Sequence, residues 1–176
     1  MILEGERTRI REFRLDDADD CAVIIGDDRV TSFLSFDSRP PEAGVAMVEH
    51  AAKAAAVDPR SEFYMGVTTE DNDTVIGFIR LALTGVKAAK LGYAIHADHW
   101  HKGYASDAVS TMIAYGFDSL GLHRITAAIG PDNKRSIDLV ERIGFKHEGL
   151  LRDHVFTNGE WRDSELYSML ISDRLV

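Results

Sequence analysis

The chain has 176 residues, of which 45% are hydrophobic and 28% are charged, and 20 Lys plus Arg against 29 Asp plus Glu give a net charge of −9. This length favours one domain, 1–176, and the hydrophobic content is too high for a disordered chain. The negative charge opposes the backbone of DNA or RNA, so we expect no nucleic-acid partner. An acidic surface favours cationic partners or serves solubility alone.

The N-terminal residues 1–13 contain no apolar segment behind a basic patch, and no stretch approaches the roughly 18 apolar residues that span a bilayer. We therefore expect a cytoplasmic protein with no membrane partner. The single cysteine, Cys21, lies in an apolar run and has no second cysteine to bond. A buried, inert thiol is the favoured interpretation, and no metal is expected.

The first half of the chain predicts a strand at 8–15, followed by a helix whose positive end carries the acidic residues Asp16, Asp17, Asp19 and Asp20. A second helix follows Pro41 and runs to roughly Val57. Three segments rich in β-forming residues come next, and the first two flank a turn-rich segment typical of a hairpin. These predicted strands are 63–67, 74–83 and 90–95.

In the second half, apolar residues recur at helical spacing from Gly103 to Leu120, before Gly121. A short strand follows, and then a helix that Asp132 or Asn133 can cap and that ends at Gly144. Two further strands surround an Asn-Gly step, a strong hairpin signal. These three predicted strands are 124–129, 145–156 and 160–171. The order predicts an α/β (α+β) sandwich with a mixed sheet of about seven strands flanked by about four helices.

The chemistry concentrates at residues 90–106, where a strand ends, a loop follows and a helix begins at Gly103. The free N–H groups of a first helical turn bind anions, and glycine lets a phosphate approach the backbone. Lys102 adds a positive charge. The loop has neither the spacing of a Walker loop nor that of a dinucleotide fingerprint. By itself this pattern also fits an ordinary helix start.

Four ordered motifs narrow the interpretation. They are WHKGYA at 100–105, NKRS at 133–136, LEGERTRIREFRLDDADD at 3–20 and EGLLRDHVFTNGEWRDSELYSML at 148–170. Together they resemble the GNAT acyltransferase superfamily over nearly the whole chain. Trp100 stands where that family usually has Gln or Arg, which is similar to the RimJ/RimL branch of ribosomal-protein N-terminal acetyltransferases. The resemblance implies the GNAT fold, with acetyl-CoA as co-substrate.

In this family the pyrophosphate sits on the first turn after the loop, and pantetheine pairs with the open edge left where two parallel strands diverge. The resemblance therefore implies that the Ile95 N–H meets the thioester carbonyl, an interaction worth roughly 3 kcal/mol where such donors were removed. Asn133 resembles an asparagine that contacts the cofactor arm. The residues so implied for cofactor binding are Tyr93, Ala94, Ile95, Trp100, His101, Lys102, Gly103, Tyr104, Ala105, Ser106, Asn133 and Ser136.

The proton donor and the base are less well marked. Many GNAT enzymes protonate the leaving thiolate with a tyrosine, but Val140 stands in its place, and the resemblance to the RimJ/RimL branch points to Ser136 instead. Ser136 is equally suited to a first-turn contact. Positions where relatives carry a carboxylate read Ala89, Ala128 and Val155. The remaining candidate bases are His96, His99, Glu148, Asp153 and His154, and water is a further route.

The resemblance implies an N-acetyltransferase that moves an acetyl group to a primary amine by direct attack in a ternary complex. A protein N-terminus, a polyamine and an aminated small molecule all suit an acidic surface, to which Asp27, Asp28, Asp37 and Glu42 contribute. The alternative is a non-catalytic acyl-CoA-binding or sensor module of the same fold. Arg152 and Asp163 are expected to pair within the terminal hairpin. Monomer and homodimer both remain open.

Overall fold

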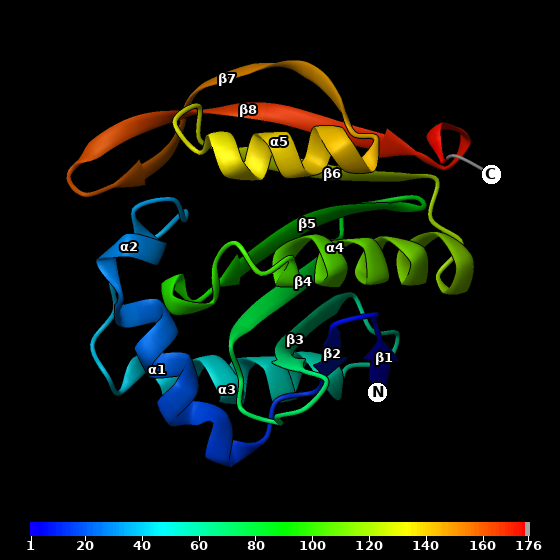
Figure 1. Cartoon of the computed structure of the whole chain (residues 1–176). Coiled ribbons are helices and arrows are strands. Elements are labelled where there is room, and N and C mark those ends of the chain that lie inside the picture. The colour runs from blue at the N-terminus through cyan, green and yellow to red at the C-terminus, as the bar shows by residue number, and fades with distance from the viewer. Residues whose placement is uncertain (175–176) are drawn as a thin grey trace.

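The computed structural model describes residues 1–174, which form one mixed sheet of eight strands in the order β1-β2-β3-β4-β5-β6-β8-β7 (Figure 1). The strands are β1 Ile2–Glu4, β2 Thr8–Arg11, β3 Glu62–Thr69, β4 Gly77–Leu83, β5 Ala88–Ile95, β6 Arg124–Ile129, β7 Lys146–Thr157 and β8 Glu160–Leu170. Helices α1 Ala18–Gly26, α2 Asp28–Thr31, α3 Ala43–Ala55, α4 Tyr104–Ala114 and α5 Lys134–Ile143 accompany them. The predicted fold class is confirmed.

Two short elements account for the difference from about seven strands and four helices. β1 is three residues long and pairs antiparallel with β2, so it carries too little alternation to be recognised. α2 is a single turn whose start is capped by the Asp27 side chain, which accepts from the Arg29 N–H at 2.9 Å. The predicted strand 8–15 was too long, because the chain leaves the sheet after Arg11 and turns at Leu15–Asp17.

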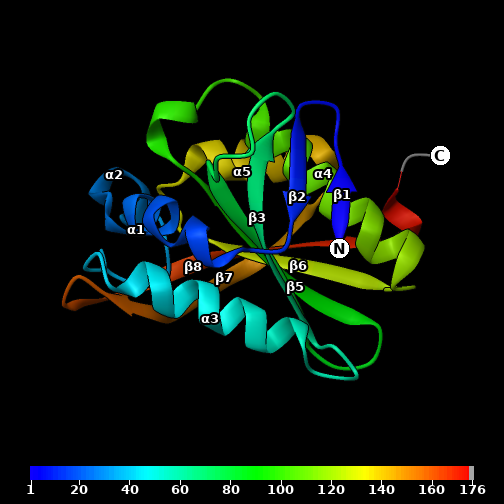
Figure 2. The ribbon, with the colours of Figure 1, turned by 90° about the horizontal axis from the view of Figure 1, so that it is seen from below.

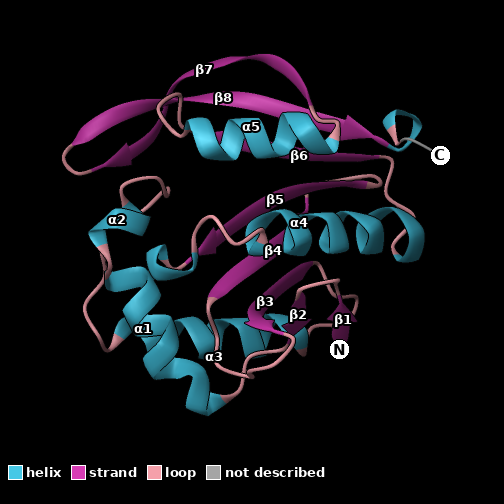
Figure 3. Ribbon diagram, in the orientation of Figure 1, coloured by secondary structure: helices cyan, strands magenta, loops and turns pink. Residues whose placement is uncertain are grey.

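Helices cover both faces of the sheet, as the view along it shows (Figure 2). Strand residues alternate between the two sides: Ile79 packs in the cluster with α4 and α5, whereas Phe78 packs in the cluster with α1 and α3. Figure 3 shows α1 and α3 crossing near one end of the strands. Cys21 lies fully buried in this second cluster, and burial raises the pKa of its thiol to about 12. The buried, free thiol is confirmed.

The parallel pair β5 and β6 is the feature that positions the site. β5 contacts β6 over Ala88–Lys90 alone, although β5 stays paired with β4 as far as Ile95. From Leu91 onward the two strands therefore diverge, which is visible in Figure 1. The His96 N–H donates to the Ile76 carbonyl at 2.8 Å. Because backbone groups alternate along an antiparallel ladder, those of Tyr93 and Ile95 point away from β4, toward the open edge.

Glycine and asparagine place the ends of the neighbouring helices. α5 begins at Asn133, whose side chain accepts from the Ser136 N–H at 3.2 Å, and ends at Gly144 with φ of 114°. After Ala114 the helix α4 continues as one wider turn to Ser119. The β7–β8 hairpin turns at Asn158 and Gly159, both with positive φ, as the sequence predicts.

Inside that hairpin one expected contact is corrected. The Asp163 carboxylate accepts the Asp153 N–H at 2.8 Å, so in the structure it binds the backbone of a strained, positive-φ residue and not the Arg152 side chain. The register of β7 and β8 shifts between Leu151 and Val155, and Asp153 lies in this bulge as an exposed residue.

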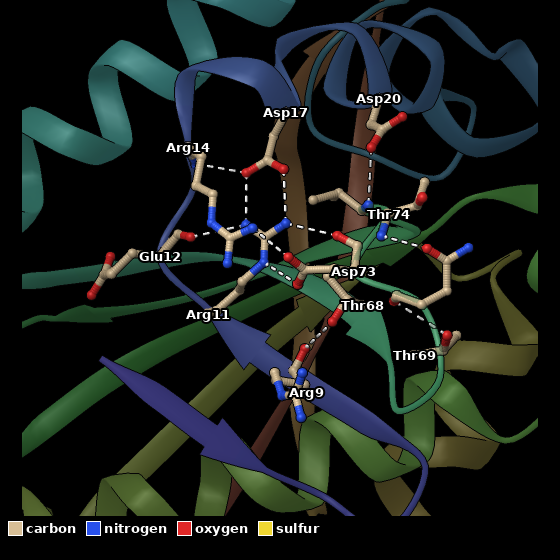
Figure 4. A network of polar contacts seen from close by, with 12 residues as sticks. Arg9, Arg11, Glu12, Arg14, Asp17, Asp20, Thr68, Thr69, Asp73 and Thr74 are labelled. Atoms are coloured by element: carbon tan, nitrogen blue, oxygen red, sulfur yellow. Dashed lines mark hydrogen bonds and ion pairs between the residues drawn. The ribbon is translucent and has the colours of Figure 1, made fainter.

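A buried ion-pair network fixes the entry to α1 (Figure 4). The Arg11 guanidinium, whose side chain is 3% exposed, donates to both Asp17 oxygens at 2.7 and 2.8 Å and to Asp73 Oδ1 at 2.8 Å. Burial alone would raise the pKa of Asp17, but the hydrogen bonds from Arg11 and from the Arg14 N–H, together with the charges of these two residues, hold that pKa below its usual value. Within residues 1–174, no helix is long and apolar enough to cross a membrane.

Candidate active site

A cavity of about 530 Å³ opens where β5 and β6 diverge. All of the residues predicted for cofactor binding line it except Lys102, although their role stays a prediction. Further lining residues come from α2, the loop after it and α5, and sequence reasoning did not single them out. They are Val30, Phe33, Leu34, Arg135, Asp138, Leu139 and Arg142. His99 also faces this cavity. The arrangement brings a strand edge, a helix N-terminus and a second helix together around one hollow.

The floor of the cavity at α4 is backbone. Gly103 is the N-cap with φ of 81°, and His101 also has positive φ of 62°. Apart from the residues next to it in the chain, the atoms nearest to a Cβ added at Gly103 belong to the Arg7 side chain, at 3.6 to 3.9 Å. The first-turn N–H groups of α4 therefore stay open to an anion.

Arg7 is a basic residue of this site that the sequence did not reveal. It lies in the turn between β1 and β2, and its Nη1 reaches the Lys102 carbonyl at 3.5 Å. Lys102 itself lines an adjoining groove of about 1260 Å³, which Arg7, His101 and Gly103 share. Within residues 1–174, neither Arg7 nor Lys102 has an acidic partner within 4.0 Å. Two uncompensated cations thus flank the start of α4 in a protein of net charge −9.

Asp107 holds that turn in place. From the first turns of α4 its carboxylate accepts the N–H groups of Glu6, Arg7 and Thr8 at 2.9, 3.1 and 2.9 Å, and the Thr8 hydroxyl at 2.6 Å. Burial acts to raise the pKa of Asp107, but these donors together lower it. The Asp107 carboxylate therefore holds the N-terminal turn, which places Arg7 in the adjoining groove beside the start of α4.

Ser136 and Tyr93 meet across the open edge. Their hydroxyl oxygens are 2.6 Å apart, one from α5 and one from β5, and both residues line the cavity. Burial raises the pKa of Tyr93 to about 12, although the hydrogen bond to Ser136 acts in the opposite direction. Sequence reasoning included Tyr93 for its backbone and missed its phenol, because nothing local in the chain signals a contact with residue 136.

Trp100 joins the two sides of the cavity. Its indole Nε1 donates to the Ile95 carbonyl at 2.7 Å, the Arg135 guanidinium lies 4.8 Å from the ring centroid, and the Phe33 ring centroid is 6.5 Å away. The Ile95 carbonyl is consequently occupied, whereas the Ile95 N–H faces the open edge. The Trp100 side chain therefore links β5 to α5 and to the segment after α2. The sequence motif indicates only that Trp100 lies in the loop before α4, and it does not predict these side-chain contacts.

Among the five candidate bases, His99 is the one that lines the cavity. Burial and the nearby Lys102 charge lower the pKa of His99, which favours the neutral imidazole that a base requires. His96 lies 3.3 Å from Asp27, and His154 Nδ1 lies 2.9 Å from the Ser164 hydroxyl.

The other two candidates are held by their surroundings. Glu148 pairs with Arg124 at 2.9 Å and accepts from Ser168, contacts that lower its pKa to about 2. Such a carboxylate is a weak base. Asp153 sits in the hairpin bulge described above and does not line the cavity.

The acidic residues expected to attract an amine are largely engaged elsewhere. Asp27 pairs with Arg29 at 2.6 Å, and Asp28 accepts from the Ser38 hydroxyl. Asp37 accepts the Asn158 N–H at 2.7 Å, which ties the segment after α2 to the β7–β8 hairpin. None of these residues, nor Glu42, lines the cavity.

The strand edge, glycine-capped helix and hydroxyl pair lie around one cavity on a mixed sheet, an arrangement suited to an extended ligand with an anionic group. Comparison with known proteins agrees, because residues 7–146 match the Acetyltransferase (GNAT) domain family. The chain belongs to this family and is therefore an acyl-transferring enzyme of the N-acetyltransferase type. The resemblance to GNAT enzymes and to their RimJ-like branch is confirmed.

Two relatives and one solved structure illustrate the likeness. An uncharacterized N-acetyltransferase, YoaA of Bacillus subtilis (strain 168), is 31% identical over 172 residues, which is 96% of each chain. The ribosomal protein uS5-alanine N-acetyltransferase of Escherichia coli (strain K12) is 35% identical over 116 residues, 64% of this chain and 60% of that one. Mycobacterium smegmatis RimJ in complex with CoA-disulfide has a TM-score of 0.85 at 19% identity, covering 98% of this chain and 88% of the other, and so shares the fold.

Proposed function

We propose that residues 1–176 act as a single catalytic domain that transfers the acetyl group of acetyl-CoA to a primary amine by direct attack in a ternary complex. The observation that carries this proposal is the convergence of the Ile95 N–H, the Ser136 hydroxyl and the open start of α4 on one cavity. Relatives of the same family support it.

The site fits the shape and charge of acetyl-CoA. Gly103 leaves the start of α4 without a side chain of its own, and the Arg7 side chain stands beside it. The first N–H groups of α4 would hold the pyrophosphate, with the dipole of that helix opposing its charge. The unpaired edge of β5 at Tyr93 and Ile95 would take the pantetheine amides as a further strand would. When bound, acetyl-CoA supplies the activated acetyl thioester.

The residues of the cavity then have distinct tasks. The Ile95 N–H, fixed by the β4 pairing, stabilises negative charge that develops on the carbonyl oxygen. Ser136, in the first turn of α5, donates a proton to the departing thiolate. The acceptor amine must be neutral to attack, and His99 or a water molecule at the cavity accepts its proton. The apolar side chains of Phe33, Leu34 and Leu139 line the cavity and would limit the access of competing water once the cofactor is bound.

The acceptor approaches past α2 and the β7–β8 hairpin. This wall is tied together where Arg162 donates to the Ser32 carbonyl at 2.9 Å. The lining residues Val30, Phe33 and Leu34 are apolar, so they favour an amine carried on a small or aliphatic group. The name of the E. coli relative points to an alanine N-terminus. We accordingly place a protein N-terminal α-amine first, ahead of a polyamine or an aminated small molecule.

The experiment has two stages. Calorimetric titration with acetyl-CoA measures binding, and a thiol-release assay then compares peptides with N-terminal alanine, spermidine and an aminoglycoside. Release with the peptide supports the proposed acceptor, and release with another amine supports the transferase while rejecting that acceptor. No binding of acetyl-CoA would overturn the function as a whole. Binding with no release from any amine would favour the non-catalytic acyl-CoA module.

Ser136→Ala tests the proton donor. The substitution removes the hydroxyl and leaves the Asn133 cap on the Ser136 N–H intact. We expect kcat to fall by about a hundredfold, at the lower end of what general acids contribute, while the Kd for acetyl-CoA changes little. An equal loss in kcat and in affinity would identify Ser136 as a cofactor contact instead.

A further inference from the structure

The contact between Tyr93 and Ser136 joins the two elements that diverge at the site. β5 and α5 are not paired here by backbone, yet the two hydroxyl oxygens lie 2.6 Å apart at the cavity wall. In the described part of the chain neither hydroxyl makes another side-chain hydrogen bond. The pair is therefore an isolated hydroxyl dyad, and either oxygen is placed to donate to the other.

Each hydroxyl carries one proton, so one oxygen donates and the other accepts. A phenol is the more acidic group and the better donor, and burial raises the pKa of Tyr93 to about 12, so the phenol keeps its proton at neutral pH. When the phenol donates to Ser136 Oγ, the serine proton is left without an internal acceptor. It can then point into the cavity.

We propose that Tyr93 is a positioning residue that orients the Ser136 hydroxyl toward the leaving sulfur and stabilises negative charge on Oγ as the serine proton moves. The inference rests on the proposed function. It assigns to the phenol of a β5 residue the support that the Ser136 hydroxyl requires as a proton donor.

The proton balance is complete without ionising Tyr93. The amine nitrogen forms a bond to the acetyl carbon, and the bond between that carbon and sulfur breaks. The amine gives one proton to water or His99, the sulfur receives the Ser136 proton, and solvent returns a proton to Ser136. Tyr93 retains its proton and strengthens its hydrogen bond to Oγ while charge is present there.

Tyr93→Phe removes the phenol oxygen alone and keeps the ring. We expect kcat to fall about tenfold, the effect of one hydrogen bond, with the KM for acetyl-CoA nearly unchanged. Because Tyr93 acts through Ser136, the double variant should be no slower than Ser136→Ala. Tyr167→Phe is the matched control, since the Tyr167 phenol donates to Glu141 of the same helix α5 at 3.0 Å but lies outside the cavity. Its kcat should remain at the wild-type value.

A second measurement does not depend on turnover. Serine donation to a bound thiolate lowers the pKa of the CoA thiol, which ultraviolet absorbance of the thiolate follows in complexes of each protein with CoA. We expect a lower thiol pKa with the wild type than with Ser136→Ala, and loss of most of that difference in Tyr93→Phe. Tyr167→Phe should match the wild type.

Three results would overturn the inference. The first is a kcat of Tyr93→Phe equal to that of the wild type. The second is a loss of kcat in the double variant that equals the product of the two single losses. The third is a pKa of the bound CoA thiol that is the same in Tyr93→Phe and in the wild type. Each can occur in an active enzyme, so each leaves the transferase itself intact. By contrast, failure of the wild type to bind acetyl-CoA or to release thiol refutes the proposed function before Tyr93 is tested.

Discussion

The two walls of the cavity are built in different ways. The wall formed by β5 and α4 presents backbone: the open edge at Tyr93 and Ile95, and N–H groups that begin at Gly103. The wall formed by α2 presents side chains, Val30 and Phe33 among them, on a helix of one turn. A backbone wall suits one invariant ligand, whereas a side-chain wall can change its acceptor without changing the fold.

The two walls are also held in place by different contacts. The largest expected effect is on stability, and it comes from a substitution in the ion-pair network beside α1, on the side of the molecule that carries α2. Asp17→Asn leaves the Arg11 guanidinium buried with one of its two carboxylate partners neutralised. We expect a loss of about 3 kcal/mol in the free energy of unfolding, measured by urea denaturation. The Kd for acetyl-CoA, measured well below the unfolding temperature, should stay near the wild-type value, because the backbone wall is supported separately.

Glu4→Gln is the matched control, since Glu4 pairs with Arg9 at the surface and should contribute about 0.5 kcal/mol. Acid offers a second check. The pKa of Asp17 is lowered in the folded state, so its contribution is present above the unfolded pKa of about 3.9 and is lost as the pH falls further. The difference between wild type and Asp17→Asn should therefore shrink below that pH. A loss under 1 kcal/mol at neutral pH would contradict this account.

Gly103→Glu tests the anion site at the start of α4, which is part of the backbone wall. It places a carboxylate where a phosphate would approach, so acetyl-CoA affinity should fall by more than about a hundredfold in calorimetric titration. Because Gly103 has φ of 81°, the new side chain also strains the turn and should lower stability by about 1 kcal/mol. Gly121→Glu is the control for strain, since Gly121 has φ of 62° in open space and does not line the cavity. Equal affinity in both variants would refute the phosphate site.

The contrast between backbone and side-chain walls also explains which features of the protein could be predicted from the sequence and which could not. The strand 124–129, the hairpin turn at Asn158-Gly159 and the helix start at Gly103 follow from local pattern and backbone conformation, and the structure has them. The hydrogen bond from Arg7 to the Lys102 carbonyl and the contact of the Tyr93 phenol with Ser136 join residues far apart in the chain. No local spacing encodes such meetings, which depend on how β1, β2 and α5 pack against their neighbours.

The smallest expected effect tests whether the Arg7 side chain adds to the binding of acetyl-CoA at the backbone wall. Arg7→Gln removes the cation that flanks Gly103 while Asp107 still holds the turn through its backbone N–H groups. We expect the Kd for acetyl-CoA to rise about tenfold at low salt, and less at high salt because Arg7 is exposed and its charge is screened. Arg9→Gln, a change two residues away at the Glu4 pair, should leave the Kd unaltered. If both variants bind acetyl-CoA as the wild type does, the N–H groups of α4 hold the phosphates unaided.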